Sequence, residues 1–465
     1  MRIRVYLSVV VAILLSSMAA CGPAPTPEVV EKVVKETVVV EKEVEKEVQV
    51  EVTKVVEVEV TPVPGRCAAT DINEVDEILI GAVAPLSAPG AVSSGIAMRW
   101  AFSLAEKKIN EAGGVLGKPI DLVFYDTEGL PERGTSVMER LITQDCVVAV
   151  VGEYHSAVGI TMKEVAHKYH VPTVFAETWS DDITASGYDE VFRIAPTSSF
   201  VAESIADYIE KLGDVDFAVI VAENSDYGVP FAELNQELLA EQGIDSETFI
   251  SEMGAQDFSP IIARIQGLDR TPDVIIVGLS GEGSYNLEQQ MAETGLAPTE
   301  DTVSIADFTA MNPEFWTNVP DGNYSVFQYF GLTPALANDI TREFEAEYRT
   351  QFDRFPESFA LSSFDTVHII ADAIERASSL DPDAIIAALE ETDITLTQGH
   401  YYFPYGSGNP VPDDQPAWMW HQWPEPGVLF LQYYEEGQSV DEAAVVWPEV
   451  YQTHGTFFIP YGSQP

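Results

Sequence analysis

The chain has few basic residues, few cysteines and only one long apolar run. Its 465 residues include 24 Lys or Arg against 75 Asp or Glu, which gives a formal net charge of −51. A field of that sign repels nucleic acid and anionic lipid headgroups, and we expect neither as a partner. A salt-adapted surface is equally poor in Lys and Arg, so charge alone identifies no ligand. Beyond the N-terminal segment, no apolar run reaches the length of a membrane-spanning helix.

Signals of catalysis and of metal binding are also weak. No Gly-x-Ser-x-Gly nucleophile turn occurs, and the glycine-rich stretch 113–118 has the wrong spacing for a phosphate loop, with Pro119 where Ser or Thr is needed. His167 and His170 lie three residues apart, but no other Cys or His is near enough in sequence to complete a metal site. In so acidic a chain, some carboxylate pair always resembles an acid–base couple. We therefore expect no catalytic residue, no metal and no cofactor.

The N-terminus has the pattern of an export signal. Met1–Arg4 is basic, Val5–Ser17 is apolar but short, and Met18-Ala19-Ala20 precedes Cys21. This order is typical of a bacterial lipoprotein signal, in which residues 1–20 are removed and Cys21 carries the lipid. The alternative is an ordinary secretory signal with an incidental cysteine. The first reading predicts an extracytoplasmic protein of the cell envelope, lipid-anchored to the membrane.

Residues 21–66 form a segment of a different composition. A Val/Glu/Lys-rich tract lies between two proline-rich stretches. Valines at every fourth position from 40 to 60 predict a helical stripe, whereas alternation at 48–52 and 56–60 predicts strands. The tract has no aromatic residue and cannot bury a core of its own. We interpret it as a stalk, and the two patterns leave its conformation undecided. A short coiled coil is the alternative, which the weak helix propensity of valine disfavours.

The globular part begins with one β-α-β unit. Ile78–Val83 is an apolar run of strand length, and Met98, Phe102, Ala105 and Ile109 follow at helical spacing. Two glycines end this helix, and strand character returns from 120 to 125. Strands and helices then alternate along the chain, which predicts an α/β fold with parallel sheets covered by helices on both faces.

We expect two lobes that share this alternation. Lobe 1 comprises residues 67–196 and 333–395, and lobe 2 comprises residues 197–332 and 396–465. The segment 191–196 is expected to leave lobe 1, and the segment 326–330 to cross back to it. A Trp-rich C-terminal extension is interpreted as a cap on the fold or, alternatively, as a latch across the lobes; its tryptophans are Trp418, Trp420, Trp423 and Trp447.

Several segments resemble the amino-acid-type (leucine/isoleucine/valine) periplasmic solute-binding proteins of ABC importers. The resemblance runs from the first strand to about residue 404 and is carried by Ala84–Ser87, Asn110–Gly117, Gly187–Arg193, Asp226–Gly228, Ser363–Asp365 and Thr397–Gly399. It implies the type I periplasmic-binding-protein fold, in which two Rossmann-like lobes are joined by a multi-strand hinge. It also implies a small-molecule ligand in the cleft between the lobes and an ABC permease as partner.

The two remaining cysteines are candidates for a disulfide. Cys67 lies just before the first strand and Cys146 just before the third strand. The first and third strands of a doubly wound sheet are usually neighbours, so both sulfurs are expected at the same edge. Because an exported compartment permits oxidation, we favour a Cys67–Cys146 disulfide over free thiols.

Candidate ligand contacts are the residues that follow parallel strands, because ligands bind outside the carboxyl ends of such strands. In the resembling family, small hydroxyl residues and backbone amides of the third and fourth loops hold a ligand carboxylate, a role that Ser156 or His155 fits. Glu177 and Trp179 replace small residues of that fourth loop, and Ser198 stands where the family has an acid. Any of these side chains could instead be structural, as helix caps or lobe packing. The predicted set is Ser87, Tyr154, His155, Ser156, Glu177, Thr178, Trp179, Ser198, Tyr227, Ser280 and Asp307.

The sequence thus predicts an ABC-importer binding lipoprotein for a small polar ligand, an amino acid or a related amide or amine. A ligand sensor of the same fold that reports to a membrane receptor is one alternative. A secreted hydrolase that uses cleft carboxylates is another. Trp179 with nearby carboxylates would suit a cationic or quaternary amine through cation–π attraction. Because Ser198 replaces an acid of the resembling family while Glu177 and Trp179 are added, we expect such a ligand to be preferred over leucine itself.

Overall fold

The computed structural model describes residues 28–37, 51–60, 65–312, 314–322, 324–330 and 337–456. It divides into two units, residues 1–64 and 65–465. In the first unit, β1 (Glu28–Thr37) and β2 (Glu51–Val60) pair antiparallel. The described part of the Val/Glu/Lys tract therefore adopts strands rather than a helix. The predicted signal and Cys21 lie outside the described residues and stay a prediction.

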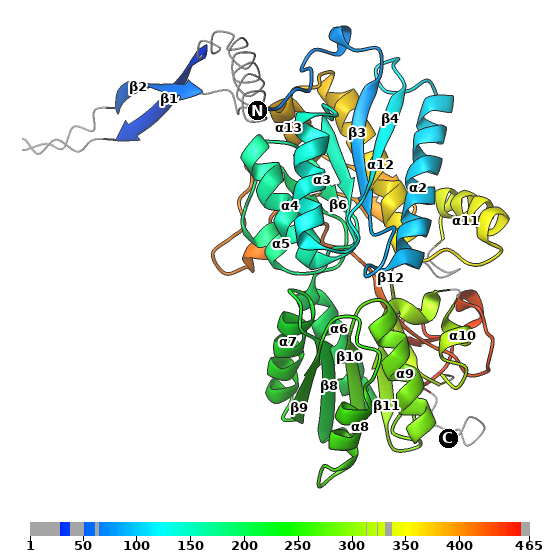
Figure 1. Cartoon of the computed structure of the whole chain (residues 1–465). Helices are drawn as coiled ribbons and strands as arrows, with labels where there is room; N and C mark the ends of the chain where they lie inside the picture. Colours follow the sequence, from blue (N-terminus) through cyan, green and yellow to red (C-terminus); the bar gives the residue numbers. More distant parts are fainter. Residues whose placement is uncertain are drawn as a thin grey trace, which may run out of the picture. The chain divides into compact units, whose positions relative to one another are not determined.

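Lobe 1 is built on a fully parallel five-stranded sheet (Figure 1). Its strands are short and mostly buried, so they show continuous apolar runs rather than alternation. In spatial order they are β4 (Ile120–Asp126), β3 (Ile78–Ala84), β5 (Ala149–Gly152), β6 (Thr173–Phe175) and β7 (Val191–Arg193).

Helices cover both faces of this sheet. On one face, α2 (Val92–Glu111) packs against α12 (Ser358–Ala377), and α13 (Pro382–Glu390) packs against α12. On the other face, α3 (Pro131–Thr143) packs against α4 (Ser156–Tyr169). The remaining helices described in this lobe are η1 (Ile72–Glu74), α5 (Asp182–Ala185), α11 (Asp339–Phe352) and η3 (Ala417–Met419). Helices on both faces, as the sequence predicts, are therefore confirmed for lobe 1.

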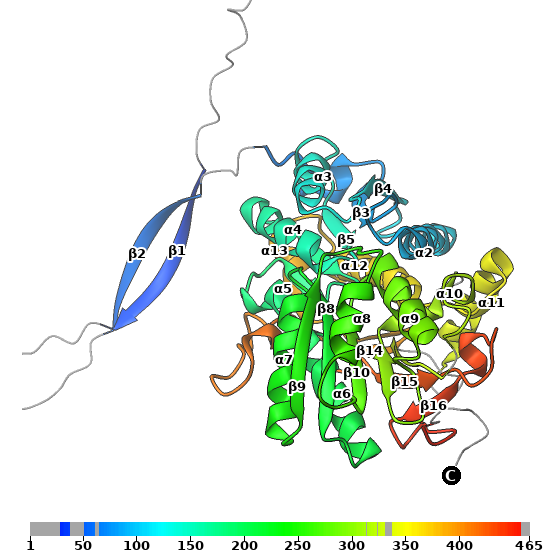
Figure 2. The ribbon, with the colours of Figure 1, turned by 60° about the horizontal axis from the view of Figure 1, so that its bottom comes forward.

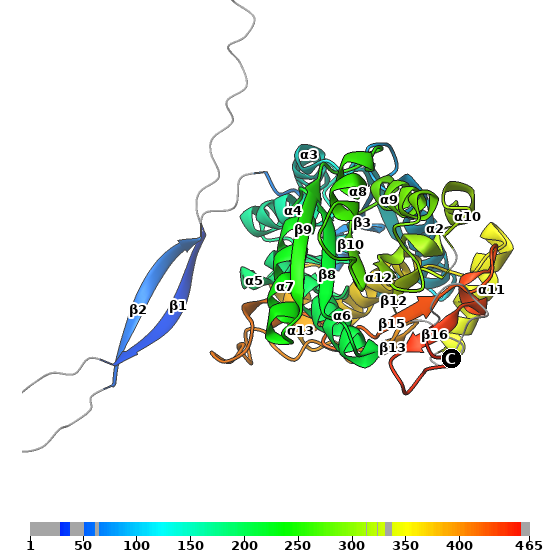
Figure 3. The same ribbon diagram turned by 90° about the horizontal axis from the view of Figure 1, so that it is seen from below.

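Lobe 2 has a mixed seven-stranded sheet. Five of its strands are parallel, and two antiparallel strands from the C-terminal region extend one edge. In Figures 2 and 3 this added pair lies at the opposite end of the sheet from β9. The order is β16 (Ala444–Trp447), β15 (Val428–Gln432), β12 (Val326–Phe330), β11 (Val303–Ala306), β10 (Val274–Gly278), β8 (Phe217–Glu223) and β9 (Asp245–Ser251).

Two helix pairs accompany the lobe 2 sheet. The first pair is α6 (Ser198–Leu212) with α7 (Gly228–Glu241), and the second is α8 (Ser259–Gln266) with α9 (Glu282–Thr294). Buried residues of the sheet divide between two core clusters: Ile220 of β8 belongs to the first and Val219 to the second. Short helices complete the lobe: η2 (Phe308–Met311), α10 (Phe315–Asn318) and η4 (Val440–Glu442).

The described elements of the second unit pass from one lobe to the other three times along the chain. The first change of lobe follows β7, and the second lies between β12 and α11; residues 331–336 lie outside the described residues. The third lies between Trp423 and β15. Two expectations are thereby corrected. Residues 191–193 form the edge strand of lobe 1 before the chain leaves, and residues 326–330 form a lobe 2 strand rather than a crossing segment.

The predicted start of the second lobe 2 segment at residue 396 is also wrong. The hairpin of β13 (Ile394–Leu396) and β14 (Gly399–Tyr401) belongs to lobe 1, because the hydroxyl of Tyr401 donates to Asp365 of α12. Beyond η3 (Ala417–Met419), Gln422 pairs with Arg193 beside β7. The chain therefore stays with lobe 1 until Trp423, and the C-terminal extension contacts both lobes.

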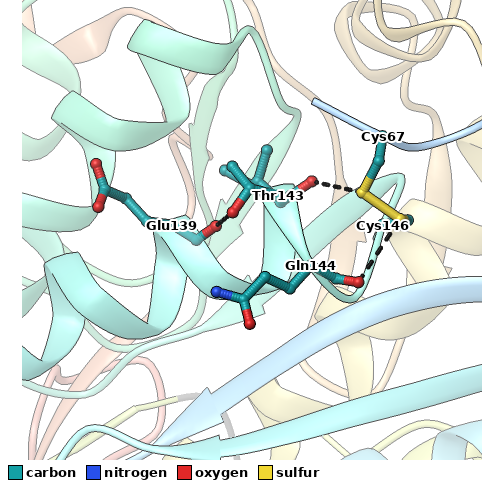
Figure 4. Close-up of a disulfide and its surroundings, with 6 residues drawn as sticks. Cys67, Glu139, Thr143, Gln144 and Cys146 are labelled. Carbon is teal, nitrogen blue, oxygen red and sulfur yellow. Dashed lines mark hydrogen bonds between the residues drawn. A yellow bond between two sulfur atoms is a disulfide. The ribbon is translucent and has the colours of Figure 1, made fainter. Parts of the chain in front are cut away.

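The predicted disulfide between Cys67 and Cys146 is confirmed (Figure 4). The Cα atoms are 4.9 Å apart, and the link closes a sequence separation of 79 residues. It ties the segment that leads into β3 to the turn between α3 and β5, because these two strands are neighbours in the sheet. In the described part of the chain, no helix combines the length and the apolar composition that a membrane span requires.

Candidate functional site

The carboxyl ends of parallel strands from both lobes border one cavity of about 560 Å³. In lobe 1 these are the ends of β5 and β6, and in lobe 2 those of β8 and β10. Ligands of doubly wound sheets bind at such ends, so this cavity is the candidate site. It is lined by Gly129, Pro131, Tyr154, His155, Ser156, Ala157, Glu177, Trp179, Glu223, Asn224, Ser225, Asp226, Tyr227, Val229, Pro230, Met253, Leu279 and Ser280.

The turn after β5 presents a neutral histidine. The backbone N–H of Ala91 donates to Nε2 of His155 at 3.1 Å, and the N–H of His155 donates to Oε1 of Glu153 at 3.1 Å. Burial lowers the pKa of His155 to about 4. The imidazole is therefore uncharged at neutral pH and acts as an acceptor toward the α2 end of the cavity.

Ser156, the first residue of α4, joins the turns after β5 and β6. Its Oγ accepts the backbone N–H groups of Trp179 and Ser180, each at 3.0 Å. Amides at a strand end are natural ligand donors, but these two are already bonded within the protein. Ser156 therefore holds the loop after β6 in place.

Glu177 is a buried carboxylate in the lobe 1 wall. Its Oε1 accepts from Oγ of Ser362 at 2.6 Å, and its Oε2 accepts from Nε1 of Trp179 at 3.2 Å. Burial raises the pKa of Glu177 to about 7, against the opposing effect of these two hydrogen bonds. Both donors are neutral, so they fix the orientation of the carboxylate without compensating its charge.

Arg193 braces the same loop from outside the cavity lining. Its guanidinium is fully buried and donates to the carbonyl oxygens of Thr178 at 3.2 Å and Ser180 at 2.5 Å. It also donates to Oε1 of Gln422 at 2.5 Å and to Oγ1 of Thr184 at 3.0 Å. The C-terminal extension is thereby linked to the loop that carries Glu177 and Trp179.

Glu223 is the corresponding carboxylate of the lobe 2 wall. It accepts from Oγ of Ser225 at 2.8 Å, and from the N–H and Oγ of Ser280 at 2.9 and 3.0 Å. Burial raises its pKa above the ordinary value. As in lobe 1, every donor in these contacts is neutral.

Aromatic rings join the two walls. Trp179 of lobe 1 and Tyr227 of lobe 2 are in edge-to-face contact, with ring centroids 5.9 Å apart. A second contact between the lobes is the hydrogen bond from Oγ of Ser93 to Oε2 of Glu314 at 3.0 Å. The lobes are thus in contact at both the aromatic wall and the N-terminal end of α2.

A second layer of acids lies beyond the lining in lobe 2. Oδ1 of Asp307 accepts from the N–H and Oγ1 of Thr309 at 2.8 and 2.6 Å. Burial raises the pKa of Asp307 to about 7 and that of Glu288 to about 8. After burial itself, the charge of Asp307 is the largest effect that raises the pKa of the Tyr154 and Tyr227 hydroxyls, so Asp307 lies close behind the two tyrosines.

Comparison with known proteins agrees with this geometry. Residues 77–411 match the family model described as periplasmic binding protein. The chain belongs to this family. It is 26% identical over 317 residues to the Leu/Ile/Val-binding protein homolog 3 of Brucella melitensis, a match that covers 67% of this chain and 82% of that protein. Family membership implies an extracytoplasmic location and a ligand-binding role.

Solved structures show the same type I fold. The leucine-binding protein LivK of Thermotoga maritima superposes with a TM-score of 0.68 at 19% identity, covering 79% of this chain and 97% of that one. The branched-chain amino-acid transporter binding protein LivJ of Streptococcus pneumoniae, in complex with isoleucine, gives 0.66 at 23% identity and covers 80% and 100%. The predicted α/β two-lobed periplasmic-binding-protein fold is therefore confirmed.

Of the predicted contacts in this family member, seven line the cavity together. They come from both lobes, as a cleft ligand requires, and are Tyr154, His155, Ser156, Glu177, Trp179, Tyr227 and Ser280. Their contact with a ligand stays a prediction.

The four other predicted residues lie outside the lining. Ser87 is exposed and bonds to Asp126. Thr178 is buried, and its carbonyl oxygen accepts from Arg193. The N–H of Ser198 donates to the carbonyl oxygen of Trp179 at 2.7 Å, so Ser198 supports the loop. Asp307 is buried in the second layer of acids.

Sequence reasoning missed the acid of the lobe 2 wall. Glu223 ends an otherwise apolar strand, and a carboxylate at the carboxyl end of a buried strand was an available signal. Met253 was missed because it follows β9, an edge strand whose mostly polar sequence gives a weak signal. In the described residues, no group of three or more His, Cys, Asp or Glu is arranged to hold a metal.

The pair His167 and His170 has a structural role. Both imidazoles bond to the carboxylate of Glu190, and Nε2 of His170 also lies 2.6 Å from Oδ1 of Asp383. These bonds raise the pKa of His170 to about 9. The two histidines therefore tie α4 to the segment before β7 and to α13.

Proposed function

We propose that this chain is the extracytoplasmic substrate-binding lipoprotein of an ABC importer. It binds a small polar ligand, an amino acid or a related amide or amine, in the cleft between the lobes. The observation that carries the proposal is the cavity itself, which is bounded by strand ends of both lobes and crossed by contacts between them. Closure of two lobes about a hinge on a ligand is a standard switching motion, and the closed form would be presented to a permease.

The anchor is proposed to be the lipid on Cys21, from its place directly after the short apolar segment. Cys21→Ser should move the protein from membrane to soluble fractions or leave the precursor uncleaved. Normal lipid labelling of that variant would contradict the anchor while leaving ligand binding unaffected.

Binding is tested by a thermal-shift screen of the mature protein across amino acids, amides and amines, followed by calorimetry on the hits. A ligand that binds the folded protein but not the unfolded chain raises the melting temperature, and the increase grows with ligand concentration. Small-angle scattering should then show a decrease in the radius of gyration as the lobes close. Conversion of a hit into product on incubation would contradict a binding protein and favour the hydrolase instead.

A further inference from the structure

The cleft holds two buried carboxyl groups, and no Lys or Arg among the described lining residues pairs with either of them. Glu177 from lobe 1 and Glu223 from lobe 2 both line the cavity, and each side chain is almost fully buried. Their hydrogen-bond donors are serines, a tryptophan and a backbone amide, all of them neutral. Among the described residues of the lining there is neither lysine nor arginine, and Arg193 lies outside it with its donors directed at carbonyl and side-chain oxygens.

Buried carboxylates are normally paired with a cation, because an isolated buried charge is costly. Burial raises the pKa of Glu177 to about 7 and that of Glu223 above its usual value, which is the expected result when no cation is present. A cationic group placed between the two walls would supply the missing partner.

Several lobe 1 amides that could hold a ligand carboxylate are already bonded within the protein. The amides of Trp179 and Ser180 are bonded to Ser156, and the amide of Ala91 is bonded to His155. His155 is neutral and offers no charge to an anion. A ligand carboxylate in this wall would face the carboxylate of Glu177 across the same cavity.

Aromatic side chains complete the lining. Trp179 and Tyr227 meet across the cleft, and Tyr154 lines the same cavity. Ring faces attract cations, and the attraction is strongest for tryptophan in a desolvated site. Two buried acids with three aromatic residues suit an organic ammonium ion, and the third acid of the lining, Asp226, is exposed.

We propose that the cleft ligand is an organic cation that carries no carboxylate, an amine or a quaternary ammonium compound, whose charged group lies between Glu177, Glu223 and the ring of Trp179. The inference rests on the proposed binding function and narrows its ligand class. It separates this chain from the amino-acid binding that the names of its relatives state.

Matched probes test the ligand class by calorimetry on the mature protein at pH 8. Leucine carries both charges, 3-methylbutylamine is leucine without its carboxylate, and 4-methylpentanoate is leucine without its ammonium group. Tetramethylammonium reports the cation alone. We expect 3-methylbutylamine to bind at least tenfold more tightly than leucine, tetramethylammonium to bind measurably, and 4-methylpentanoate not to bind.

Variants test the location of the charge. Glu177→Gln keeps the shape of the side chain and removes its charge, and it should weaken amine binding about tenfold or more because a charged hydrogen bond becomes neutral. Trp179→Ala should weaken it about 30-fold, which corresponds to a desolvated cation–π contact. Glu233→Gln is the matched control, since it removes the same charge from an exposed position on α7 outside the lining and should leave the affinity unchanged.

The outcomes distinguish this inference from the proposed function. Leucine that binds as tightly as 3-methylbutylamine, and is unaffected by Glu177→Gln, would overturn the cation inference while it supports a binding protein. Failure of all four probes would overturn the inference as well, and the broad screen would then still test the binding function separately. Circular dichroism of each variant excludes loss of fold as the cause of lost affinity.

Discussion

The two walls of the cleft carry similar acids but are held in different ways. In lobe 2, Glu223, Ser225 and Tyr227 lie within five residues, and Ser280 from the next strand end completes the set. In lobe 1, Glu177 is held by Ser362 of α12, 185 residues away in sequence. The loop of Glu177 is further braced by Arg193.

The difference shows which wall depends on the rest of the fold. The lobe 2 wall is built from a local turn at the carboxyl end of β8 and from Ser280 at the end of the neighbouring strand β10, 57 residues away in the same lobe. The lobe 1 wall requires α12 and, through the bond from Arg193 to Gln422, the C-terminal extension that is 229 residues away. We therefore expect changes around the lobe 1 wall to affect stability and binding together.

The largest effect is expected for Arg193→Ala. The substitution leaves the carbonyl oxygens of Thr178 and Ser180 and the side chain of Gln422 without their buried donor, and each unsatisfied group costs about 1–3 kcal/mol. We expect the free energy of unfolding to fall by about 3–5 kcal/mol in total, as measured by urea denaturation, and ligand affinity to fall with it.

Two controls sharpen the Arg193 prediction. Arg193→Lys keeps the charge but not the forked geometry of the guanidinium, so its unfolding free energy should fall by less than that of Arg193→Ala. Arg342→Ala removes an exposed arginine paired with Asp339, and should cost less than about 1 kcal/mol. Equal losses of unfolding free energy in Arg193→Ala and Arg342→Ala would show that Arg193 does not stabilise the loop of Glu177 and Trp179.

Removal of the disulfide is expected to rank second. Both described cysteines belong to lobe 1, so the cross-link constrains only that lobe. Constraint of the unfolded chain by a bridge of this kind is worth about 2–4 kcal/mol. Cys67→Ser with Cys146→Ser should lower the unfolding free energy by that amount, and reducing agent should have no effect on the double variant. Two free thiols in the native, unreduced protein would contradict the link.

The sequence predicted those parts of the fold that depend on local pattern. The strands β3 and β4 are largely apolar runs, so the sequence found both with an error of one residue at the carboxyl end. The strand β9 was missed because it is an edge strand of mostly polar residues, DSETFIS, with an exposed face. The strands β15 and β16 were missed because they are antiparallel additions after the alternating pattern ends.

The sequence predicted which loops line the cavity, but it did not predict the structural role of each residue around them. Strand ends identified Glu177 and Trp179, since the carboxyl ends of parallel strands meet at one edge. Neither the brace formed by Arg193 nor the role of Ser198 as a support for Trp179 was predictable. Both depend on which side chains meet through tertiary packing, and no local pattern encodes that.

The third prediction concerns pH and compares the two acids. The folded pKa of Glu177, about 7, lies above its ordinary value of 4.5. The protonated form is therefore favoured by folding, and the stability that this provides is present below pH 4.5 and is lost as pH rises through 7. In the ligand-free protein, Glu177→Gln should therefore have about the same free energy of unfolding as the wild type at pH 5. At pH 8 its free energy of unfolding should be higher by about 2–3 kcal/mol.

Glu223→Gln should also be more stable relative to the wild type at pH 8 than at pH 5, because burial also raises the pKa of Glu223. Thermal or urea unfolding at pH 5 and pH 8 measures both variants under identical conditions. A destabilised Glu177→Gln variant at pH 8 would show that the carboxylate is already compensated within the protein, which would also weaken the case for a cationic ligand.

The smallest effects are expected from the serines that hold the two acids. In lobe 2, Oγ of Ser225 donates to Glu223 and accepts the N–H of Gly228 at 3.0 Å, at the start of α7. The bond to the Gly228 amide does not depend on pH, and Glu223 keeps both donors of Ser280 when the bond from Ser225 is lost. Ser225→Ala should therefore lower the unfolding free energy by about 1 kcal/mol at both pH 5 and pH 8.

Ser362 lies within α12, where alanine is the better helix former by a few tenths of a kcal/mol. At pH 5, where Glu177 is protonated, this gain offsets much of the lost hydrogen bond, and Ser362→Ala should be nearly neutral. At pH 8 the ionised Glu177 loses one of its two hydrogen-bond donors, Ser362 and Trp179. The unfolding free energy of the same variant should then fall by about 1 kcal/mol or more, since bonds to charged groups are stronger. Urea unfolding at the two pH values measures this difference. A loss of equal size at both would mean that Glu177 does not change its charge in this range, and that the two walls differ in connectivity but not in their response to pH.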